Sequence, residues 1–167
     1  RDTGVSESGT PEFEIVILGG GSGGYACALR ASQLGLSVAL IEQAELGGTY
    51  LHRGCIPTKA LLHAAEVADE VRGSDHVGVT STFGGIDMAK VNSYKASVVA
   101  RLYKGLQGLV SSRGVTYVTG TGRLVAPNAI DVGGQRYVGR NIVLATGSYA
   151  RTLPGIDIGG LVVTSDQ

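Results

Sequence analysis

The sequence predicts an α/β protein built on a Rossmann-like, doubly wound and mostly parallel sheet with a small antiparallel β insert. Two buried-strand patterns, at residues 12–18 and 37–42, flank a helical pattern at residues 22–34, which is the spacing of a strand–helix–strand unit. A glycine-rich turn, Gly19-x-Gly21-x-x-Gly24, follows the first strand, and Glu42 ends the second. Together these observations are typical of a domain that binds a dinucleotide.

The remaining elements follow in order along the chain. Residues 55–72 and 87–112 predict two helices, and the second has apolar residues every three or four positions on one face. Residues 115–118 predict a third strand that completes the parallel core with the first two. Residues 120–140 predict short antiparallel strands joined by turns at Pro127-Asn128 and Gly133-Gly134. Residues 141–145 predict one more buried strand.

Composition bounds the class of protein. The chain has 167 residues, of which 43% are hydrophobic and 17% charged, so we expect a folded core. Fourteen basic and fourteen acidic residues give a formal net charge of zero, which argues against a nucleic-acid partner. Since no apolar run approaches the roughly 20 residues needed to span a bilayer, we also expect no membrane partner. Residues 1–11 are polar and predict a disordered tail, which leaves residues 12–167 as the folded domain.

The two cysteines, Cys27 and Cys55, are too few for a disulfide scaffold and lack the spacing of metal ligands. They favour a reducing, cytoplasmic location and no bound metal. The three histidines also lack a partner pattern, and we expect His52 to lie on the surface or in a loop.

The glycine turn has a specific chemistry. Gly19 allows a tight turn, Gly21 lets the backbone approach a pyrophosphate, and Gly24 lets helix and strand pack closely. Free N–H groups at the helix start then bind the anion. Glu42 can accept hydrogen bonds from a ribose 2′-OH and would repel a 2′-phosphate. The turn alone does not separate FAD from NAD, and a glycine-rich turn without any nucleotide is the alternative.

Longer stretches resemble a known family. The segment "GGTYLHRGCIPTKALLHAAE" resembles the redox segment of the pyridine nucleotide–disulfide oxidoreductases, most closely their lipoamide dehydrogenase branch. The stretches "ILGGGSGGYACALRASQLGLSVALIE", "YKGLQGLV", "GTGRL", "IVLATGS" and "LPGI" are similar in order and spacing. This resemblance implies an FAD-binding domain that forms the first segment of a larger architecture. The NAD domain and the interface domain of that architecture would then be absent from these 167 residues.

The resemblance also implies a set of site residues. The glycine turn would bind the FAD pyrophosphate, Glu42 the adenosine ribose, Lys59 would lie near the flavin ring and Gly122 by the adenine. Cys55 would be the redox cysteine that lies against the flavin. The full set of implied cofactor residues is Gly19, Gly21, Ser22, Gly23, Gly24, Glu42, Gly47, Gly48, Thr49, Lys59, Gly122, Thr146, Gly147 and Ser148.

One position departs from the family pattern. The redox motif is C-x-x-x-x-C, and its first cysteine should stand at position 50, where this sequence has Tyr50. Thiol–disulfide exchange needs an attacking thiolate and a partner sulfur, and a phenol supplies neither. We therefore expect the FAD-binding portion of a flavoprotein disulfide reductase that does not turn over dihydrolipoamide by itself.

Two alternatives remain open. One is a stand-alone or engineered flavin-binding module without catalysis, and the other is a flavin oxidase or diaphorase that uses Cys55 alone. In each case FAD is the expected cofactor. We also expect association into a homo-oligomer, because missing domains would leave apolar surface exposed.

Overall fold

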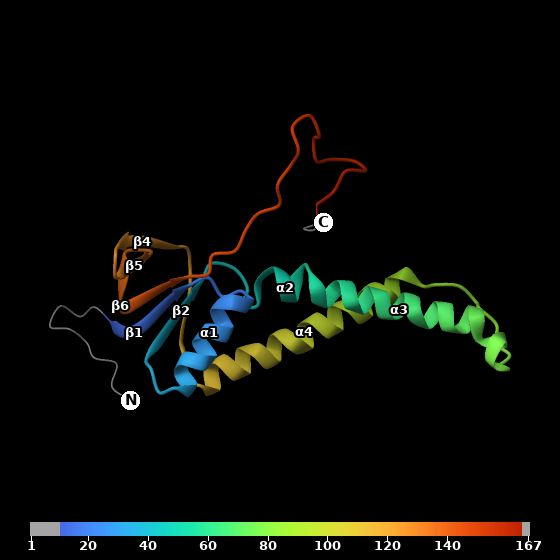
Figure 1. Cartoon of the computed structure of the whole chain (residues 1–167), viewed down its shortest axis with the longest axis horizontal. Coiled ribbons are helices and arrows are strands. Elements are labelled where there is room, and N and C mark those ends of the chain that lie inside the picture. The colour runs from blue at the N-terminus through green and yellow to red at the C-terminus, as the bar shows by residue number, and fades with distance from the viewer. Residues whose placement is uncertain (1–10, 165–167) are drawn as a thin grey trace.

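The computed structural model describes residues 11–164, so the predicted tail lies outside the described residues except for Pro11. The backbone carbonyl of Pro11 accepts a hydrogen bond from the N–H of Val138 at 3.1 Å. The elements are β1 (Glu12–Leu18), α1 (Ser22–Gln33), β2 (Val38–Glu42), α2 (Gly48–His52), α3 (Cys55–Gly73), η1 (Ser74–Val77), α4 (Met88–Ser112), β3 (Thr116–Thr119), β4 (Gly122–Ala126), β5 (Ala129–Val132) and β6 (Gln135–Leu144) (Figure 1).

A six-stranded sheet organises the chain, with the strand order β3-β2-β1-β6-β5-β4. β1 pairs in parallel with β2 on one side and with β6 on the other, and β2 pairs in parallel with β3. β5 is antiparallel to both β4 and β6. The predicted fold class is therefore confirmed: a Rossmann-like, mostly parallel sheet with a small antiparallel part.

Both faces of the central strands are buried, which explains their nearly unbroken apolar sequences. On one face Ile17 of β1 packs with Ala28 of α1 and Val110 of α4. On the other face Val16 of β1 packs with Ile130 of β5. Burying an aliphatic side chain of this size contributes about 1.5–3 kcal/mol. The antiparallel strands thus cover the face of the sheet that α1 leaves open.

The helices α3 and α4 lie side by side and extend away from the sheet (Figure 1). α4 begins at Asp87, whose side chain accepts a hydrogen bond from the N–H of Lys90 at 3.1 Å. Its other end is anchored to α1, because the buried Ser32 hydroxyl donates to the carbonyl of Arg113 at 2.5 Å. Although α4 has 25 residues, neither it nor any other helix within residues 11–164 is apolar enough over a sufficient length to cross a bilayer.

β6 differs from the expected arrangement of separate strands. Residues 135–144 form one continuous strand that pairs first with β5 and then with β1. The change of partner falls at Val138 and Gly139. A Cβ on Gly139 would lie 2.8 Å from the Val16 side chain, so the missing side chain lets the strand pass close to β1. The antiparallel insert therefore continues into the parallel core without a break.

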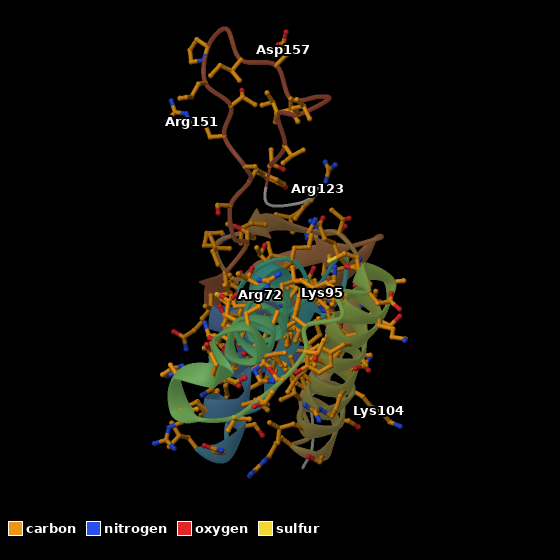
Figure 2. The ribbon with its side chains drawn as sticks, turned by 90° about the vertical axis from the view of Figure 1, so that its right-hand side faces the viewer. Arg72, Lys95, Lys104, Arg123, Arg151 and Asp157 are labelled. Atoms are coloured by element: carbon orange, nitrogen blue, oxygen red, sulfur yellow. The ribbon has the colours of Figure 1, made fainter. Side chains whose placement is uncertain are left out.

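After β6 the chain leaves the sheet as a segment with little regular structure. Figure 2 shows Arg151 and Asp157 on this segment, away from the sheet and the helices. Apolar side chains along it are exposed, including Leu153, Ile156 and Leu161. The first residues of the segment line the candidate site.

Candidate functional site

Two residues of the glycine turn after β1 have no room for a side chain, because neighbouring backbone atoms lie too close. Gly19 has φ +106°, and a Cβ on it would collide with the carbonyl of Ala145. A Cβ on Gly24 would collide with the carbonyl of Gly19. Both glycines therefore serve the close packing of β1, α1 and the segment after β6, as predicted for a turn of this kind.

Gly21 and Gly23 are different, because the protein leaves space around them. Among the described residues, no heavy atom outside their chain neighbours and the helix's own backbone lies within 4 Å of a Cβ built on either one. Gly21 precedes the first turn of α1 with φ −67° and ψ −173°, which any residue adopts. The N–H groups of this turn lack partners within the helix, and the helix dipole makes the position favourable for an anion. Packing therefore explains Gly19 and Gly24, whereas packing among the described residues does not explain Gly21.

Glu42 is held in a fixed orientation at the end of β2. Its Oε2 accepts a hydrogen bond from the N–H of Gly20 at 2.6 Å, and its Oε1 accepts one from the N–H of Ala44 at 2.8 Å. These bonds join the acid to the glycine turn on one side and to the following bend on the other. Each carboxylate oxygen keeps a second lone pair that can accept a ligand hydroxyl.

The start of α2 forms the next part of the site. Gly47 and Gly48 have φ +111° and +58°, which favours glycine at both positions. The N–H of Gly47 donates to the carbonyl of Gly20 at 2.9 Å, and a Cβ on Gly48 would lie 2.9 Å from the Cα of Gly21. The backbone before Thr49 is thus docked directly on the glycine turn. The sequence did not predict this five-residue helix as a separate element.

The end of β6 supplies the third part. The N–H of Ala145 donates to the carbonyl of Leu18 at 2.8 Å, which extends the pairing of β6 with β1 by one residue. Gly147 then turns the chain with φ +78°. Thr146 and Ser148 flank this turn and line the site with it.

These three parts line an open cavity of about 1120 Å³. A typical small-molecule pocket has roughly 300–1,000 Å³, so this cavity suits an extended ligand. Nine of the predicted site residues line it: Gly21, Ser22, Gly23, Glu42, Gly48, Thr49, Thr146, Gly147 and Ser148. The cavity is also lined by residues that the sequence reasoning did not assign to the cofactor: Gln43, Ala44, Glu45, Tyr50, His52, Arg53, Ala145, Tyr149 and Ala150. All of these lie within three positions of a predicted residue in the chain.

Six predicted site residues do not line this cavity: Gly19, Gly24 and Gly47, which pack within the turns described above, and Cys55, Lys59 and Gly122. Cys55 is the first residue of α3 and is exposed, as is Lys59 one turn further on. A Cβ on Gly122 would lie 2.5 Å from the Leu18 side chain, so the packing of β4 against the sheet explains this glycine. The roles of these residues beside a cofactor stay predictions.

The expectation that His52 lies on the surface or in a loop is wrong. His52 ends α2, and its side chain is only 15% exposed. Its ring contacts Tyr103 of α4 edge-on, with ring centroids 5.0 Å apart. Cys27 is half-buried and packs against the core cluster of Ile17, and the thiols of Cys27 and Cys55 are both free. Over residues 11–164, His, Cys, Asp and Glu side chains form no cluster of three or more that could hold a metal ion.

A glycine turn at the carboxyl edge of a parallel sheet, with an acid at the end of the next strand, defines a Rossmann-like dinucleotide-binding domain. The family model described as "Pyridine nucleotide-disulphide oxidoreductase" matches residues 13–167, and the chain belongs to this family.

Similar proteins from a bacterium and a plant are consistent with this assignment. The chain is 39% identical over 170 residues to the dihydrolipoyl dehydrogenase of Bacillus subtilis, covering 93% of this chain and 36% of the relative. It is 42% identical over 163 residues to the mitochondrial dihydrolipoyl dehydrogenase 1 of Arabidopsis thaliana, covering 93% and 32%. The chain thus spans about a third of the length of these relatives.

A solved structure has the same fold. The Cu(II) complex of an HOCl-induced flavoprotein disulfide reductase from Escherichia coli superposes with a TM-score of 0.72 at 25% sequence identity. The match covers 87% of this chain and 31% of that chain. The larger protein is therefore similar to this chain over about a third of its own length.

Proposed function

We propose that this chain is the FAD-binding portion of a flavoprotein disulfide reductase of the lipoamide dehydrogenase type. The observation that carries the proposal is Gly21. Its backbone conformation admits any residue, its Cβ would meet no protein atom among residues 11–164, and it lines the cavity. A glycine that packing does not require, at the N-terminus of a helix, is what close contact with a pyrophosphate demands.

The residues present fit FAD. The N–H groups at the start of α1 would hold the pyrophosphate, and Glu42 would accept hydrogen bonds from the adenosine ribose. Thr49 would lie along the ligand on one side, and Thr146 and Ser148 on the other. Bound FAD supplies reversible two-electron transfer. The contribution of this chain is to bind and orient the cofactor and to shield one side of it from water.

We further propose that the chain does not carry out thiol–disulfide exchange. Tyr50 stands where the family motif has its first cysteine, and its phenol cannot form a disulfide with Cys55. Cys27 packs against the core on α1 and is an unsuitable replacement. A flavin-binding module without catalysis and an oxidase that uses Cys55 alone are both compatible with the lack of a disulfide partner.

Reconstitution with FAD tests the proposal. The purified chain is mixed with FAD, desalted and examined by absorbance, and we expect a flavin spectrum that remains with the protein. We then expect no reduction of NAD on addition of dihydrolipoamide. A folded protein that elutes without flavin would refute the binding function. Turnover by the chain alone would refute the second part, and oxygen consumption driven by another reductant would favour the oxidase.

We also propose that the chain forms a homo-oligomer. Apolar side chains are exposed along the two long helices, among them Leu61, Leu62 and Val67 on α3 and Leu102 and Leu109 on α4. Such a surface favours association in water. Sedimentation velocity over a range of concentrations tests this proposal, and a monomer at every concentration would contradict it.

A further inference from the structure

We propose that His52 is a positioning residue that holds the backbone at residues 46–49 in the conformation that binds the dinucleotide. The inference rests on the proposed function, and it assigns to His52 a role that no sequence motif indicates. The role is to set the affinity of the site through the backbone of residues 46–49, which the imidazole engages from the wall of the cavity.

The contacts of the imidazole fix its orientation. Nε2 lies 3.0 Å from the backbone carbonyl oxygen of Leu46. Because a carbonyl oxygen only accepts, Nε2 must carry a proton and donate it. Nδ1 faces the carboxylate of Glu45 at 3.5 Å, and the ring packs edge-on against Tyr103 at a centroid distance of 5.0 Å. The imidazole is therefore held from two sides, by the bend before α2 and by α4.

This orientation places a restraint where the backbone is otherwise loose. Gly47 and Gly48 both have positive φ, and a glycine pair leaves many alternative conformations open. Moreover, α2 has five residues, too few to be stable by helix formation alone. The hydrogen bond from His52 to Leu46 ties the last residue of α2 to the residue directly before this glycine pair. It closes the segment into a loop whose two ends are fixed.

The restrained segment is the one that contacts the glycine turn. Leu46 is 1% exposed and belongs to the core cluster of the sheet, so the carbonyl that His52 engages is itself anchored. The next residue, Gly47, donates its N–H to the carbonyl of Gly20 at 2.9 Å. A continuous set of contacts therefore leads from Tyr103 through His52 and Leu46 to the turn that would receive the pyrophosphate.

Two substitutions separate the hydrogen bond from the bulk of the ring. His52→Leu keeps an apolar side chain beside Tyr103 and removes the donor, whereas His52→Gln keeps an N–H donor of similar reach. We expect the leucine variant to bind FAD about 5- to 10-fold more weakly, the effect of one lost intramolecular hydrogen bond. We expect the glutamine variant to recover most of this loss. His63→Leu is the matched control, since that histidine is exposed on α3, and its affinity should equal that of the unmodified chain.

The measurement is a titration of the apo protein with FAD, at a temperature where circular dichroism shows every variant fully folded. Under this condition a residue that only stabilises the fold leaves the dissociation constant unchanged. Visible circular dichroism of the bound flavin provides a second readout of cofactor orientation, and we expect its amplitude to change in the leucine variant. If the leucine variant does not fold, His52→Asn replaces it. The side chain of asparagine is one methylene shorter than that of glutamine, so this variant should show the same loss of FAD affinity as the leucine variant.

The outcomes separate this inference from the proposed function. If the unmodified chain binds no FAD, the proposed function fails and the inference falls with it. If it binds FAD and the leucine variant binds equally well, only the inference is refuted. A glutamine variant as weak as the leucine variant would also refute it, because the donated hydrogen bond would then not be the cause.

Discussion

Replacing Gly21 by alanine adds one methyl group to the candidate binding site and changes little else. The backbone at this position has φ −67° and ψ −173°, which alanine adopts without strain. In the part of the chain that the structure describes, a Cβ here would have no heavy atom within 4 Å, apart from its own chain neighbours. The new methyl group would therefore occupy the cavity, at the point where the pyrophosphate would approach the start of α1.

The expected effect on binding follows from the contacts that a displaced phosphate would lose. One hydrogen bond to a charged group contributes about 1.5–3 kcal/mol, and about 1.4 kcal/mol corresponds to a tenfold change in affinity. We therefore expect the dissociation constant for FAD to rise about 10- to 150-fold. The free energy of unfolding of the apo protein should change by no more than about 1 kcal/mol, since alanine is a much poorer N-cap than glycine but lowers the conformational entropy of the unfolded chain. Titration of the apo protein with FAD and urea unfolding measure the two quantities.

Two other glycines serve as controls for Gly21→Ala. Gly24→Ala should lower the free energy of unfolding, because its Cβ would collide with the carbonyl of Gly19. Gly105→Ala lies within α4 in open space, so it should raise the free energy of unfolding by about 0.5–1 kcal/mol and leave affinity unchanged. An unchanged dissociation constant for Gly21→Ala, in a chain that binds FAD, would refute the reasoning. A gain of affinity in the stabilised Gly105→Ala variant would show that the titration reports stability.

Three further predictions concern other parts of the molecule. Tyr50→Cys gives three thiols with the two native cysteines, and oxidation should leave one free by pairing position 50 with Cys55; three remaining thiols would contradict this placement. Burial raises the pKa of Tyr117 above its ordinary value of about 10. As pH rises past about 10, the phenol therefore ionises first in the unfolded chain, and the folded state loses stability until the pH passes the higher folded-state pKa. Tyr117→Phe should therefore lose less stability than the unmodified chain between pH 8 and about pH 11 in urea unfolding. Ser32→Ala removes the buried hydrogen bond to Arg113 and should lower the free energy of unfolding by about 1 kcal/mol; an equal urea midpoint would contradict it.

Local patterns were sufficient to predict most elements of the fold. The strand at residues 12–18 matches β1, and the helix predicted at residues 22–34 ends one residue later than α1. These predictions succeed because both faces of β1 are buried, which requires a run of apolar residues, and because a glycine turn stops that run. The acid at the end of β2 is also placed by local sequence, since it ends the strand. Its hydrogen bond with the N–H of Gly20 then follows from the short distance between the parallel strands β1 and β2, and its bond with the N–H of Ala44 is local to the bend after β2.

Contacts between distant segments could not be predicted in this way. The continuity of β6 depends on the space that Gly139 leaves for Val16, which is more than a hundred residues earlier in the chain. The burial of His52 depends on Tyr103 of α4 and on a carbonyl in a bend that has no sequence signature. The role of Gly122 beside the adenine stays a prediction from family resemblance, and its close packing against Leu18, a contact between distant segments, could be seen only in the fold.

The cavity and the thiol motif depend on different atoms, so the thiol motif can be lost while the cavity is kept. Tyr50 is 45% exposed and lines the cavity, but the hydrogen bonds that shape the site run through the backbone of Gly20 and Gly47 and through the carboxylate of Glu42. These bonds do not involve the side chains at positions 50 and 55. A change from cysteine to tyrosine at position 50 therefore removes the partner that Cys55 would need for a disulfide without disturbing the glycine turn. We therefore expect this chain to retain flavin while exchanging no thiols.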